Sequence, residues 1–374
     1  MKKIMLLGAG MVGKAMAIDL CRDFEVTAVD MEPAALQPLQ DGYPIRTLTA
    51  DLSQPQTVTG LAAGQDLILG AVPGFMGYRT LEAVLTAGVN CVDISFFPED
   101  PFGLDALAQA RGVTAVVDCG VAPGMSNLIL GYHQRAMSID RFECLVGGLP
   151  LKRDWPFEYK APFSPLDVIE EYLRPARLIE NGRIVTRPAL SEPELVNLAP
   201  VGTLEAFNTD GLRTLLNMTG IPDMKEKTLR YPGHCQLMKI LRDTGFLSDE
   251  PISCNGARIS PRELTSSILL PQWKLGEAEK EFTIMRIILE GRAADGPRKH
   301  LYHLYDVYDE ETRTSSMART TGYTATAAAR LVLAGRFARK GICPPEYLGA
   351  EAGCFEAIMA DLAARRVIYT HEER

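Results

Sequence analysis

The sequence predicts an α/β protein that combines a doubly wound parallel sheet with a second, mixed α/β domain built on an antiparallel sheet. Three observations lead to this prediction. They are a glycine-rich turn near the N-terminus, alternating short strands and helices over residues 1–122, and a hairpin pattern in the second half. The chain has 374 residues, a length that normally divides into two or three compact units.

The first element is a short apolar strand, Lys3 to Leu7, followed by the turn GAGMVG and a helix from Gly13 to Leu20. In such a turn Gly8 permits the tight bend, Gly10 lets the backbone approach a pyrophosphate, and the third glycine lets the helix pack on the strand. The free N–H groups of the helix N-terminus face the anion. Because a second strand, Glu25 to Val29, follows at once, the sequence predicts a dinucleotide-binding turn.

The second strand is followed directly by Asp30. A carboxylate at this position accepts hydrogen bonds from both ribose hydroxyls of the adenosine half and repels a 2′-phosphate. Its neighbours Met31 and Glu32 supply no arginine to hold such a phosphate, so the cofactor predicted is NAD rather than NADP. The alternative is that Asp30 only caps a turn.

The alternation continues with helices such as Tyr78 to Ala87 and Gly103 to Arg111. The strands between them are Ile45 to Ala50, Leu67 to Val72, Asn90 to Ile94 and Val113 to Asp118. Ligands of parallel sheets bind beyond the carboxyl ends of the strands. The candidate cofactor contacts are therefore Gly8, Ala9, Gly10, Met11, Val12, Gly13, Asp30, Met31, Asp51, Leu52, Ala71, Val72, Pro73, Asp118, Cys119 and Gly120. Cys119 itself is interpreted as a buried thiol, because no partner base is near in sequence.

After residue 127 the alternation stops and a different pattern begins. The apolar segments Arg141 to Gly147, Glu281 to Glu290 and His300 to Tyr308 predict strands, and GRAADGPRK predicts that the last two form an antiparallel hairpin. The segments Thr324 to Ala334 and Gly353 to Ala364 predict helices, and the second has one apolar face. The predicted boundaries are 1–122, 123–320 and 321–374.

The composition excludes several classes of partner. The net charge is −8 and no long run of Lys or Arg occurs, which argues against a nucleic-acid or membrane-surface partner and favours a small molecule. Because Lys14 and Asp19 interrupt the apolar N-terminus, a secretory signal is not predicted, and we expect a cytoplasmic protein. The eight cysteines form no C-x-x-C pair and are interpreted as thiols. No metal site is predicted, because His300 and His303 point to opposite faces of a strand.

Several motifs resemble the saccharopine dehydrogenase family, in order and over nearly the whole chain. They are GAGMVG, AVPGFMGY, VDISFF, DCGVAPGMSN, GGLP, FNTDGLRTL and LRYPGH. The resemblance implies a Rossmann domain whose last elements return from the C-terminus. It also implies an inserted domain that supplies the substrate pocket and commonly the interface of a homodimer or higher homo-oligomer.

Departures from the saccharopine-forming relatives concern four positions. Those relatives tend to have Tyr where Phe96 stands, Asp where Ala122 stands, Cys where Val146 and Gly147 stand, and Arg where Thr209 stands. A pocket without these polar groups suits a smaller substrate with fewer carboxylates. The segment PFEYKAPFSPLDVIEEYLRPAR, with FNTDGLRTL and LRYPGH, makes the chain most similar to the branch of the family that oxidises the ε-amine of lysine with NAD.

Candidate residues for this amino acid substrate come from several segments. Arg213 or Arg230 would hold the α-carboxylate in a bidentate pair, and Asp210 would receive the α-ammonium group. His234 or Lys160 would act as the base. The further candidate substrate contacts are Tyr231, Ser95, Phe96 and Ala122.

Two other functions remain open from the sequence. One is a saccharopine-type or carboxyspermidine-type reductase that joins an amine to an aldehyde. The other is an NAD-binding sensor that catalyses no reaction.

Overall fold

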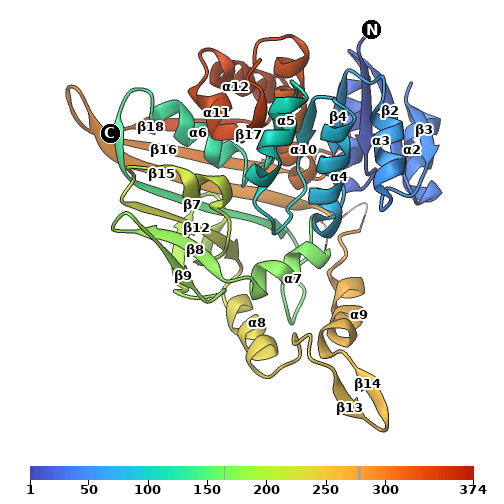
Figure 1. Ribbon diagram of the computed structural model, residues 1–374. Coiled ribbons are helices and arrows are strands. Elements are labelled where there is room, and N and C mark those ends of the chain that lie inside the picture. Colours follow the sequence, from blue (N-terminus) through green and yellow to red (C-terminus); the bar gives the residue numbers. More distant parts are fainter. Residues whose placement is uncertain (164, 277–278) are drawn as a thin grey trace. The chain divides into compact units, whose positions relative to one another are not determined.

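The computed structural model describes residues 1–163, 165–276 and 279–374. The chain forms two compact units, and each contains segments that are distant in sequence. Unit 1 comprises Met1–Ser138 and Met317–Tyr369, and unit 2 comprises Ile139–Ser316 and Thr370–Arg374. Figure 1 shows both with their elements labelled.

The centre of unit 1 is a parallel sheet. Within the described residues it has seven strands in the order β17-β6-β5-β4-β1-β2-β3. This order reverses direction at β1 and β4, which is the arrangement of a Rossmann fold. The strands are β1 (Lys3–Leu7), β2 (Glu25–Asp30), β3 (Arg46–Thr49), β4 (Leu67–Gly70), β5 (Cys91–Asp93), β6 (Thr114–Val116) and β17 (Gly341–Cys343).

Helices cover both faces of this sheet because alternate side chains of its strands are apolar in both directions. Met5 and Leu7 of β1 belong to a core cluster with residues of α3, α4 and α5, whereas Leu6 packs towards α1. The helices of unit 1 are α1 (Met11–Leu20), α2 (Pro33–Gly42), α3 (Pro55–Ala62), α4 (Gly74–Thr86), η1 (Pro101–Leu104), α5 (Asp105–Ala110), α6 (Met125–His133), α10 (Ser316–Leu333), α11 (Pro345–Ala350) and α12 (Cys354–Ala364). The predicted α/β fold with a parallel sheet is confirmed.

The boundary between the units lies at residues 138 and 139, not at 122 and 123 as the sequence predicted. The predicted boundary was drawn where the sequence pattern changes, close to residue 127. The structure places α6, which spans this change, in unit 1. Asn127 of this helix donates to Glu346 of α11 at 3.0 Å, and the ring of Tyr132 stacks on Phe355 of α12 at 4.0 Å. Similarly, the return to unit 1 begins at Met317 instead of residue 321, and the last five residues rejoin unit 2.

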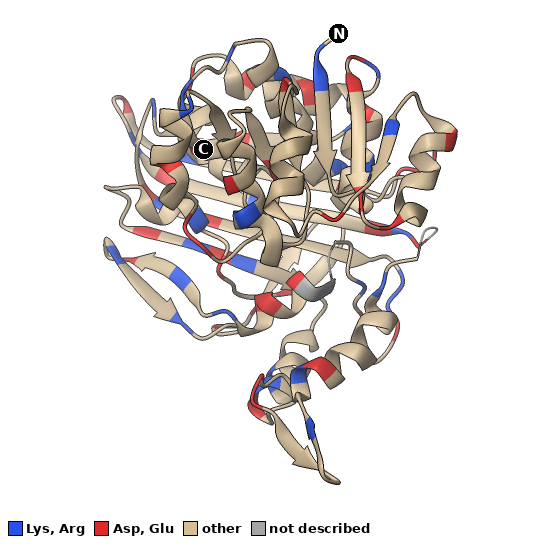
Figure 2. Cartoon of the chain, turned by 45° about the vertical axis from the view of Figure 1, so that its right-hand side comes forward, with Lys and Arg blue, Asp and Glu red and all other residues tan. Residues whose placement is uncertain are grey.

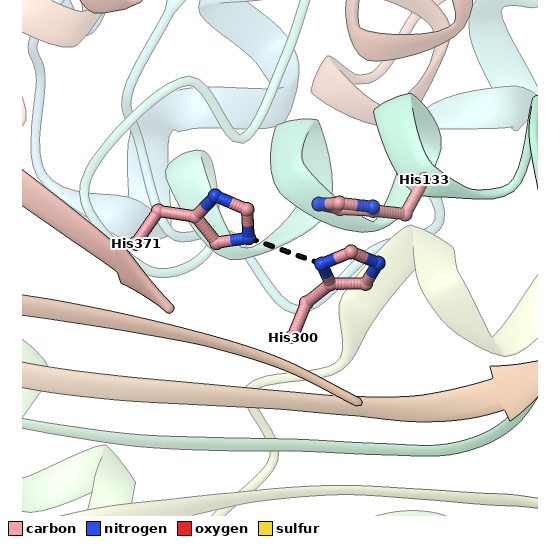
Figure 3. Close-up of side chains that lie close together, drawn as sticks. All are labelled: His133, His300 and His371. Atoms are coloured by element: carbon pink, nitrogen blue, oxygen red, sulfur yellow. Dashed lines mark hydrogen bonds between the residues drawn. The ribbon is translucent and has the colours of Figure 1, made fainter. Parts of the chain in front are cut away.

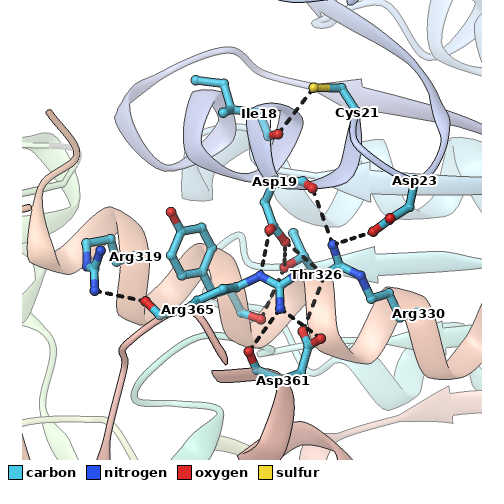
Figure 4. A network of polar contacts seen from close by, with 10 residues as sticks. Ile18, Asp19, Cys21, Asp23, Arg319, Thr326, Arg330, Asp361 and Arg365 are labelled. Carbon is cyan, nitrogen blue, oxygen red and sulfur yellow. Dashed lines mark hydrogen bonds and ion pairs between the residues drawn. The ribbon is translucent and has the colours of Figure 1, made fainter. Parts of the chain in front are cut away.

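A buried carboxylate joins α1 to the C-terminal helices of unit 1 (Figure 4). Asp19 of α1 accepts hydrogen bonds from Thr326 and Arg330 of α10 and from Arg365, directly after α12. Asp361 pairs with both arginines. Burial opposes the charge of Asp19, but its arginine and threonine partners hold its pKa below the ordinary value. The C-terminal helices are therefore held in unit 1 by charge as well as by apolar packing.

Unit 2 is built on a mixed sheet. Its main order in the described residues is β10-β11-β12-β7-β15-β16-β18, with β8 beside β12 and β9 beside β8. Strands β12 and β7 are parallel, whereas β11 and β12 are antiparallel. The strands are β7 (Ser138–Pro150), β8 (Ala176–Glu180), β9 (Arg183–Arg187), β10 (Glu194–Leu198), β11 (Gly202–Asn208), β12 (Asp223–Arg230), β15 (Glu281–Ala293), β16 (Gly296–Val307) and β18 (Tyr369–Glu373).

The predicted hairpin is confirmed by β15 and β16. The two strands pair antiparallel from Phe282 with Val307 to Ala293 with Gly296. Both strands extend farther than the pattern predicted, so that only Ala294 and Asp295 remain in the turn. Gly296 takes φ 135°, a conformation that favours glycine, which explains the Asp-Gly signal.

The helices of unit 2 are α7 (Pro165–Leu173), η2 (Arg213–Asn217), α8 (His234–Asp243) and α9 (Pro261–Trp273). The short strands β13 (Ile252–Cys254) and β14 (Ala257–Ile259) form a separate two-stranded sheet. Among the described residues, no helix is both long and apolar enough to span a membrane. Figure 2 shows acidic and basic residues interspersed over the elements of both units, and the expectation of no nucleic-acid partner stays a prediction.

Candidate active site

The glycine-rich turn lies at the carboxyl end of β1, where the strand order reverses. Gly8 has φ 98°, and a Cβ there would lie 2.4 Å from the carbonyl oxygen of Ala71. A Cβ on Gly13 would lie 2.1 Å from the carbonyl oxygen of Gly8. Around Gly10, in contrast, no described atom lies within 4 Å of the corresponding position. The protein therefore needs two of the three glycines for its own packing, and the third leaves space beside the N-terminus of α1 for a pyrophosphate.

Asp30 is the last residue of β2, the strand that pairs with β1 beside the glycine-rich turn. One carboxylate oxygen accepts from the backbone N–H of Ala9 at 2.7 Å, and the other accepts from that of Glu32 at 2.9 Å. Each oxygen has a second lone pair with which it can accept a ribose hydroxyl. The carboxylate thus fixes the turn and keeps acceptor capacity, so these residues fit the adenosine half of a dinucleotide.

The remaining cofactor candidates lie at the same edge of the parallel sheet. Met31 and Asp51 are exposed, and hydrogen bonds from Ser53 lower the pKa of Asp51. Ala71 continues from β4 and donates its backbone N–H to Leu7. Pro73 is the N-cap of α4. Leu52 and Val72 are buried in the core cluster, where they support the edge from below.

The turn at residues 118–124 also lies in unit 1. Asp118 is buried with φ 52°, which ends the extended backbone of β6 before the predicted strand end. Cys119 is buried, and burial raises the pKa of its thiol well above the ordinary value, as expected for an unreactive cysteine. The backbone N–H of Gly120 donates to Pro123, which closes the turn.

Three substrate candidates lie in unit 1 as well. Ser95 is buried after β5, and its backbone N–H donates to Asp93 at 2.7 Å. Phe96 and Ala122 are half-buried.

In unit 2, Arg230 and His234 come together in a buried group of polar and aromatic side chains. Arg230 ends β12 and is 2% exposed, and His234 begins α8 and is 3% exposed. The phenol of Tyr172, on α7, lies between them. It is 2.9 Å from Nε2 of His234 and 3.2 Å from Nε of Arg230.

The hydrogen bonds determine how this group is protonated. Nδ1 of His234 lies 2.9 Å from the carbonyl oxygen of Phe157, which only accepts, so Nδ1 carries the proton. Burial lowers the pKa of His234 to about 3, and the charge of Arg230 acts in the same direction. Nε2 of this neutral imidazole therefore accepts from Tyr172. Burial raises the pKa of Tyr172 to about 12, so its phenol keeps the proton that it donates.

Arg230 has further partners. Its guanidinium donates to the carbonyl of Leu229 at 3.0 Å, to the phenol of Tyr159 at 3.4 Å and to Glu171 at 2.7 Å. The same guanidinium lies 4.4 Å from the ring centroid of Tyr159, which adds a cation–π contact. A positive charge is thus fixed in the interior of unit 2 by neutral groups and by one carboxylate.

The other substrate and catalytic candidates lie outside this group. Asp210 accepts a bidentate pair from Arg177, and Arg213 is buried at the start of η2. Lys160 donates to the carbonyl of Gln272. Tyr231 donates to the carbonyl of Pro150 and lies under the guanidinium of Arg153, in a different core cluster. Of the predicted unit 2 residues, His234 and Arg230 share the hydrogen-bond partner Tyr172.

Sequence reasoning assigned no role to Tyr159, Glu171, Tyr172 or Trp273. Three of the four lie in the segment PFEYKAPFSPLDVIEEYLRPAR, which was identified as distinctive. A usable signal was present in α7, where Val168, Ile169 and Tyr172 recur at helical spacing and are buried. This spacing places Glu171 beside the buried face.

The two histidines of His300-x-x-His303 point in different directions, as the strand pattern predicted. His300 is buried, and its Nδ1 lies 3.0 Å from Nε2 of His371 on β18 (Figure 3). His303 pairs in register with Arg286 of β15. The expectation of no metal site stays a prediction.

Two family models match the chain. Residues 4–116 match the saccharopine dehydrogenase NADP binding domain, and residues 120–368 match the saccharopine dehydrogenase C-terminal domain. Among solved structures, apo saccharopine dehydrogenase (L-Glu forming) from Saccharomyces cerevisiae aligns with a TM-score of 0.80 at 20% identity, over 100% of both chains. Homospermidine synthase from Legionella pneumophila, solved with NAD, aligns with a TM-score of 0.72 at 12% identity, over 100% of this chain and 91% of that one.

Curated relatives agree with the family models. The mitochondrial alpha-aminoadipic semialdehyde synthase of Bos taurus is 22% identical over 99% of this chain and 47% of its own length. The chain therefore spans about half the length of the first curated relatives that it matches. The NADP(+), L-glutamate-forming saccharopine dehydrogenase of Saccharomyces cerevisiae is 23% identical over 92% of this chain and 94% of its own length. The chain belongs to the saccharopine dehydrogenase family.

Proposed function

We propose that the protein oxidises the ε-amine of L-lysine with NAD, which is the lysine 6-dehydrogenase reaction. The product is 2-aminoadipate 6-semialdehyde, which cyclises to 1-piperideine-6-carboxylate, and ammonia is released. The observation that carries this proposal is the buried guanidinium of Arg230, which pairs with one carboxylate, Glu171, among the described residues and so suits a substrate with one carboxylate. The apolar or small residues Phe96, Ala122 and Thr209 agree with it, because relatives that form saccharopine, which has three carboxylates, tend to be polar there.

The choice of NAD follows from Asp30. Its carboxylate is fixed beside the turn by Ala9 and Glu32, where it would bind the ribose hydroxyls and repel a 2′-phosphate. The matching family model is named for NADP, whereas the homospermidine synthase structure contains NAD. The ratio of kcat/KM for the two cofactors tests the choice, and a clear preference for NADP would refute it.

The chemistry requires a neutral amine and a hydride acceptor. A bound nicotinamide would supply the hydride acceptor, and loss of hydride from the ε-carbon would turn the neutral amine into an iminium ion. Water then adds to this carbon and ammonia leaves, so that one lysine, one NAD⁺ and one water give semialdehyde, ammonium and NADH. Because a lysine amine has a pKa near ~10.4 in solution, we expect the rate to rise towards alkaline pH. A rate that is constant from neutral to alkaline pH would contradict this mechanism.

The residues of unit 2 have distinct roles in this proposal. Arg230 binds the α-carboxylate, and Tyr172 and His234 hold its guanidinium in place. Since both ring nitrogens of His234 have internal partners, we assign it a positioning role and not that of the base. Lys160 and Asp210 remain candidates for moving the proton of the attacking water and for receiving the α-ammonium group.

The assay is the appearance of NADH absorbance with NAD and L-lysine, with L-ornithine and saccharopine in parallel. NADH formation from lysine alone supports the proposal. Formation from saccharopine alone would favour the second candidate, a reductase that joins an amine to an aldehyde, to which the names of the relatives point. Bound NAD without turnover of any of the three would favour an NAD-binding sensor.

We also propose that the protein forms a homodimer or higher homo-oligomer, as the family resemblance implies. Light scattering coupled to size-exclusion chromatography tests this, and a monomeric mass at micromolar concentration would refute it.

A further inference from the structure

The partners of Arg230 differ in one respect that affects ligand binding. Tyr172, Tyr159 and the carbonyl of Leu229 are neutral, and each accepts one N–H without balancing the charge. Within the described ranges, Glu171 is the residue that provides a negative charge at hydrogen-bond distance. Since a buried guanidinium without a counter-ion is strongly unfavourable, an anion is needed at this position whether or not a ligand is bound.

We propose that Glu171 takes the place of a ligand's carboxylate on Arg230 in the free protein, and that an amino acid ligand displaces it. The proposal rests on the proposed function only for the kind of ligand, an amino acid. The exchange replaces one carboxylate by another, so Arg230 keeps a counter-ion throughout. Glu171 is therefore an internal competitor of the substrate.

The position of Glu171 permits this exchange. Its side chain is 21% exposed, whereas that of Arg230 is 3% exposed, so the carboxylate can turn to water while the guanidinium stays fixed. Burial raises the pKa of Glu171, Arg230 opposes this, and the neighbouring Asp167 again disfavours its charge. Turning to water would remove the desolvation cost and screen the repulsion from Asp167.

The group also contains donors for a ligand. A guanidinium has five N–H groups, and four hydrogen bonds from Arg230 are made to described residues. Trp273 is 1% exposed and lies in ring contact with Tyr159 and Tyr172, and its indole N–H meets no acceptor in the described ranges. Glu171 accepts one described hydrogen bond from Arg230. A ligand carboxylate has enough lone pairs to accept from Arg230 and from the indole N–H of Trp273 as well.

The first experiment tests whether a free carboxylate can replace Glu171. Glu171→Ala removes the counter-ion, and we expect sodium acetate to raise the melting temperature of this variant by about 2–4 °C more than sodium chloride at equal ionic strength. The matched control is Glu170→Ala, on the same helix, whose carboxylate pairs with Arg262. It and the unchanged protein should respond equally to the two salts. An equal response of Glu171→Ala to acetate and chloride would overturn the proposal.

The second experiment tests the competition directly. Calorimetry without cofactor measures the binding of L-lysine and of cadaverine, which lacks the carboxylate, to Glu171→Gln and to Glu170→Gln. We expect Glu171→Gln to bind lysine about tenfold more tightly than Glu170→Gln does. The affinity for cadaverine should be the same in both variants. Weaker or unchanged lysine binding would overturn the proposal, because Glu171 would then support the site or contact the amine. Acetate rescue without lysine oxidation would refute the proposed function and leave this inference standing.

Discussion

Unit 1 and unit 2 each bury a charged side chain, but they neutralise it in opposite ways. In unit 1, the carboxylate of Asp19 is bonded by Arg330, Arg365 and Thr326. In unit 2, the guanidinium of Arg230 is held mainly by neutral groups and, among the described residues, pairs with one carboxylate, that of Glu171. Asp19 thus has two cationic partners within a shared ion network, whereas Arg230 has one described anionic partner.

The difference separates a structural ion network from the proposed binding site. Removal of one arginine from Asp19 leaves another in place, and both pair with Asp361 as well. Around Arg230, the described residues provide no second carboxylate at this distance. In the proposal above, a ligand carboxylate therefore has to replace Glu171, because a buried guanidinium without a counter-ion is unfavourable.

The largest effect is expected from Asp19→Asn. This change leaves two arginines without their buried carboxylate, and the free energy of unfolding should fall by about 3–5 kcal/mol. Denaturant unfolding measures the loss. Asp23→Asn, which removes a half-exposed partner of Arg330, should change the unfolding free energy by less than about 0.5 kcal/mol. If both variants were equally stable, the Asp19 network would not be structural.

The next effect concerns Arg230→Lys, which keeps the charge but loses the planar fork. We expect kcat/KM for lysine to fall about a hundredfold, because an ammonium cannot bind a carboxylate in two parallel bonds. Cadaverine serves as the comparison substrate, since its low activity should not change. An equal loss for both substrates would show that Arg230 does not recognise a carboxylate.

A smaller effect is expected from Asp30→Ser in the cofactor turn. Loss of the carboxylate should raise the KM for NAD about tenfold, because its hydrogen bonds with the ribose hydroxyls are lost. The KM for NADP should fall, because the repulsion of the 2′-phosphate is removed. Glu32→Gln removes a charge from the same loop and should leave both constants unchanged. If the cofactor preference of Asp30→Ser were unaltered, Asp30 would only cap the turn and would not select the cofactor.

The last prediction concerns acid unfolding and His234. Its folded pKa of about 3 lies below the unfolded value near ~6.5, so its contribution is fully present above that value and is lost as the pH falls towards 3. The slope is up to about 1.4 kcal/mol per pH unit for one proton. In His234→Gln, the unfolding free energy should change less steeply with pH between pH 6 and 4, because one titrating group is removed. The half-buried His303→Gln is the control, and identical slopes in both variants would argue against a neutral buried His234.

The sequence predicted the cofactor turn in detail because its signals are local. Gly8, Gly13 and Asp30 lie in one strand–turn–helix–strand segment, and spacing alone determines which atoms meet. The hairpin of β15 and β16 was predicted for the same reason, from a turn signal between two apolar runs.

The Arg230 group could be predicted only in part. Arg230 and His234 are four residues apart and were selected together, but Tyr172, Tyr159 and Trp273 join them from distant segments through tertiary packing. Their burial decides the protonation of the group, and spacing contains no information on it. Asp210 was selected from the motif FNTDGLRTL, but its structural partner is Arg177, which lies in a distant segment. The motif contains no information on this pairing.

The seventh strand of unit 1 has a consequence for synthesis on the ribosome. Strand β17 pairs with β6, but all of residues 139–316 are made between them. While unit 2 is being translated, the edge of β6 has no neighbour on that side and α1 lacks its partners from α10 and α12. Domains generally fold as they emerge, but unit 1 has to wait for its last strand, so a translational pause before residue 341 prolongs the exposure of an unpaired sheet edge to other nascent chains.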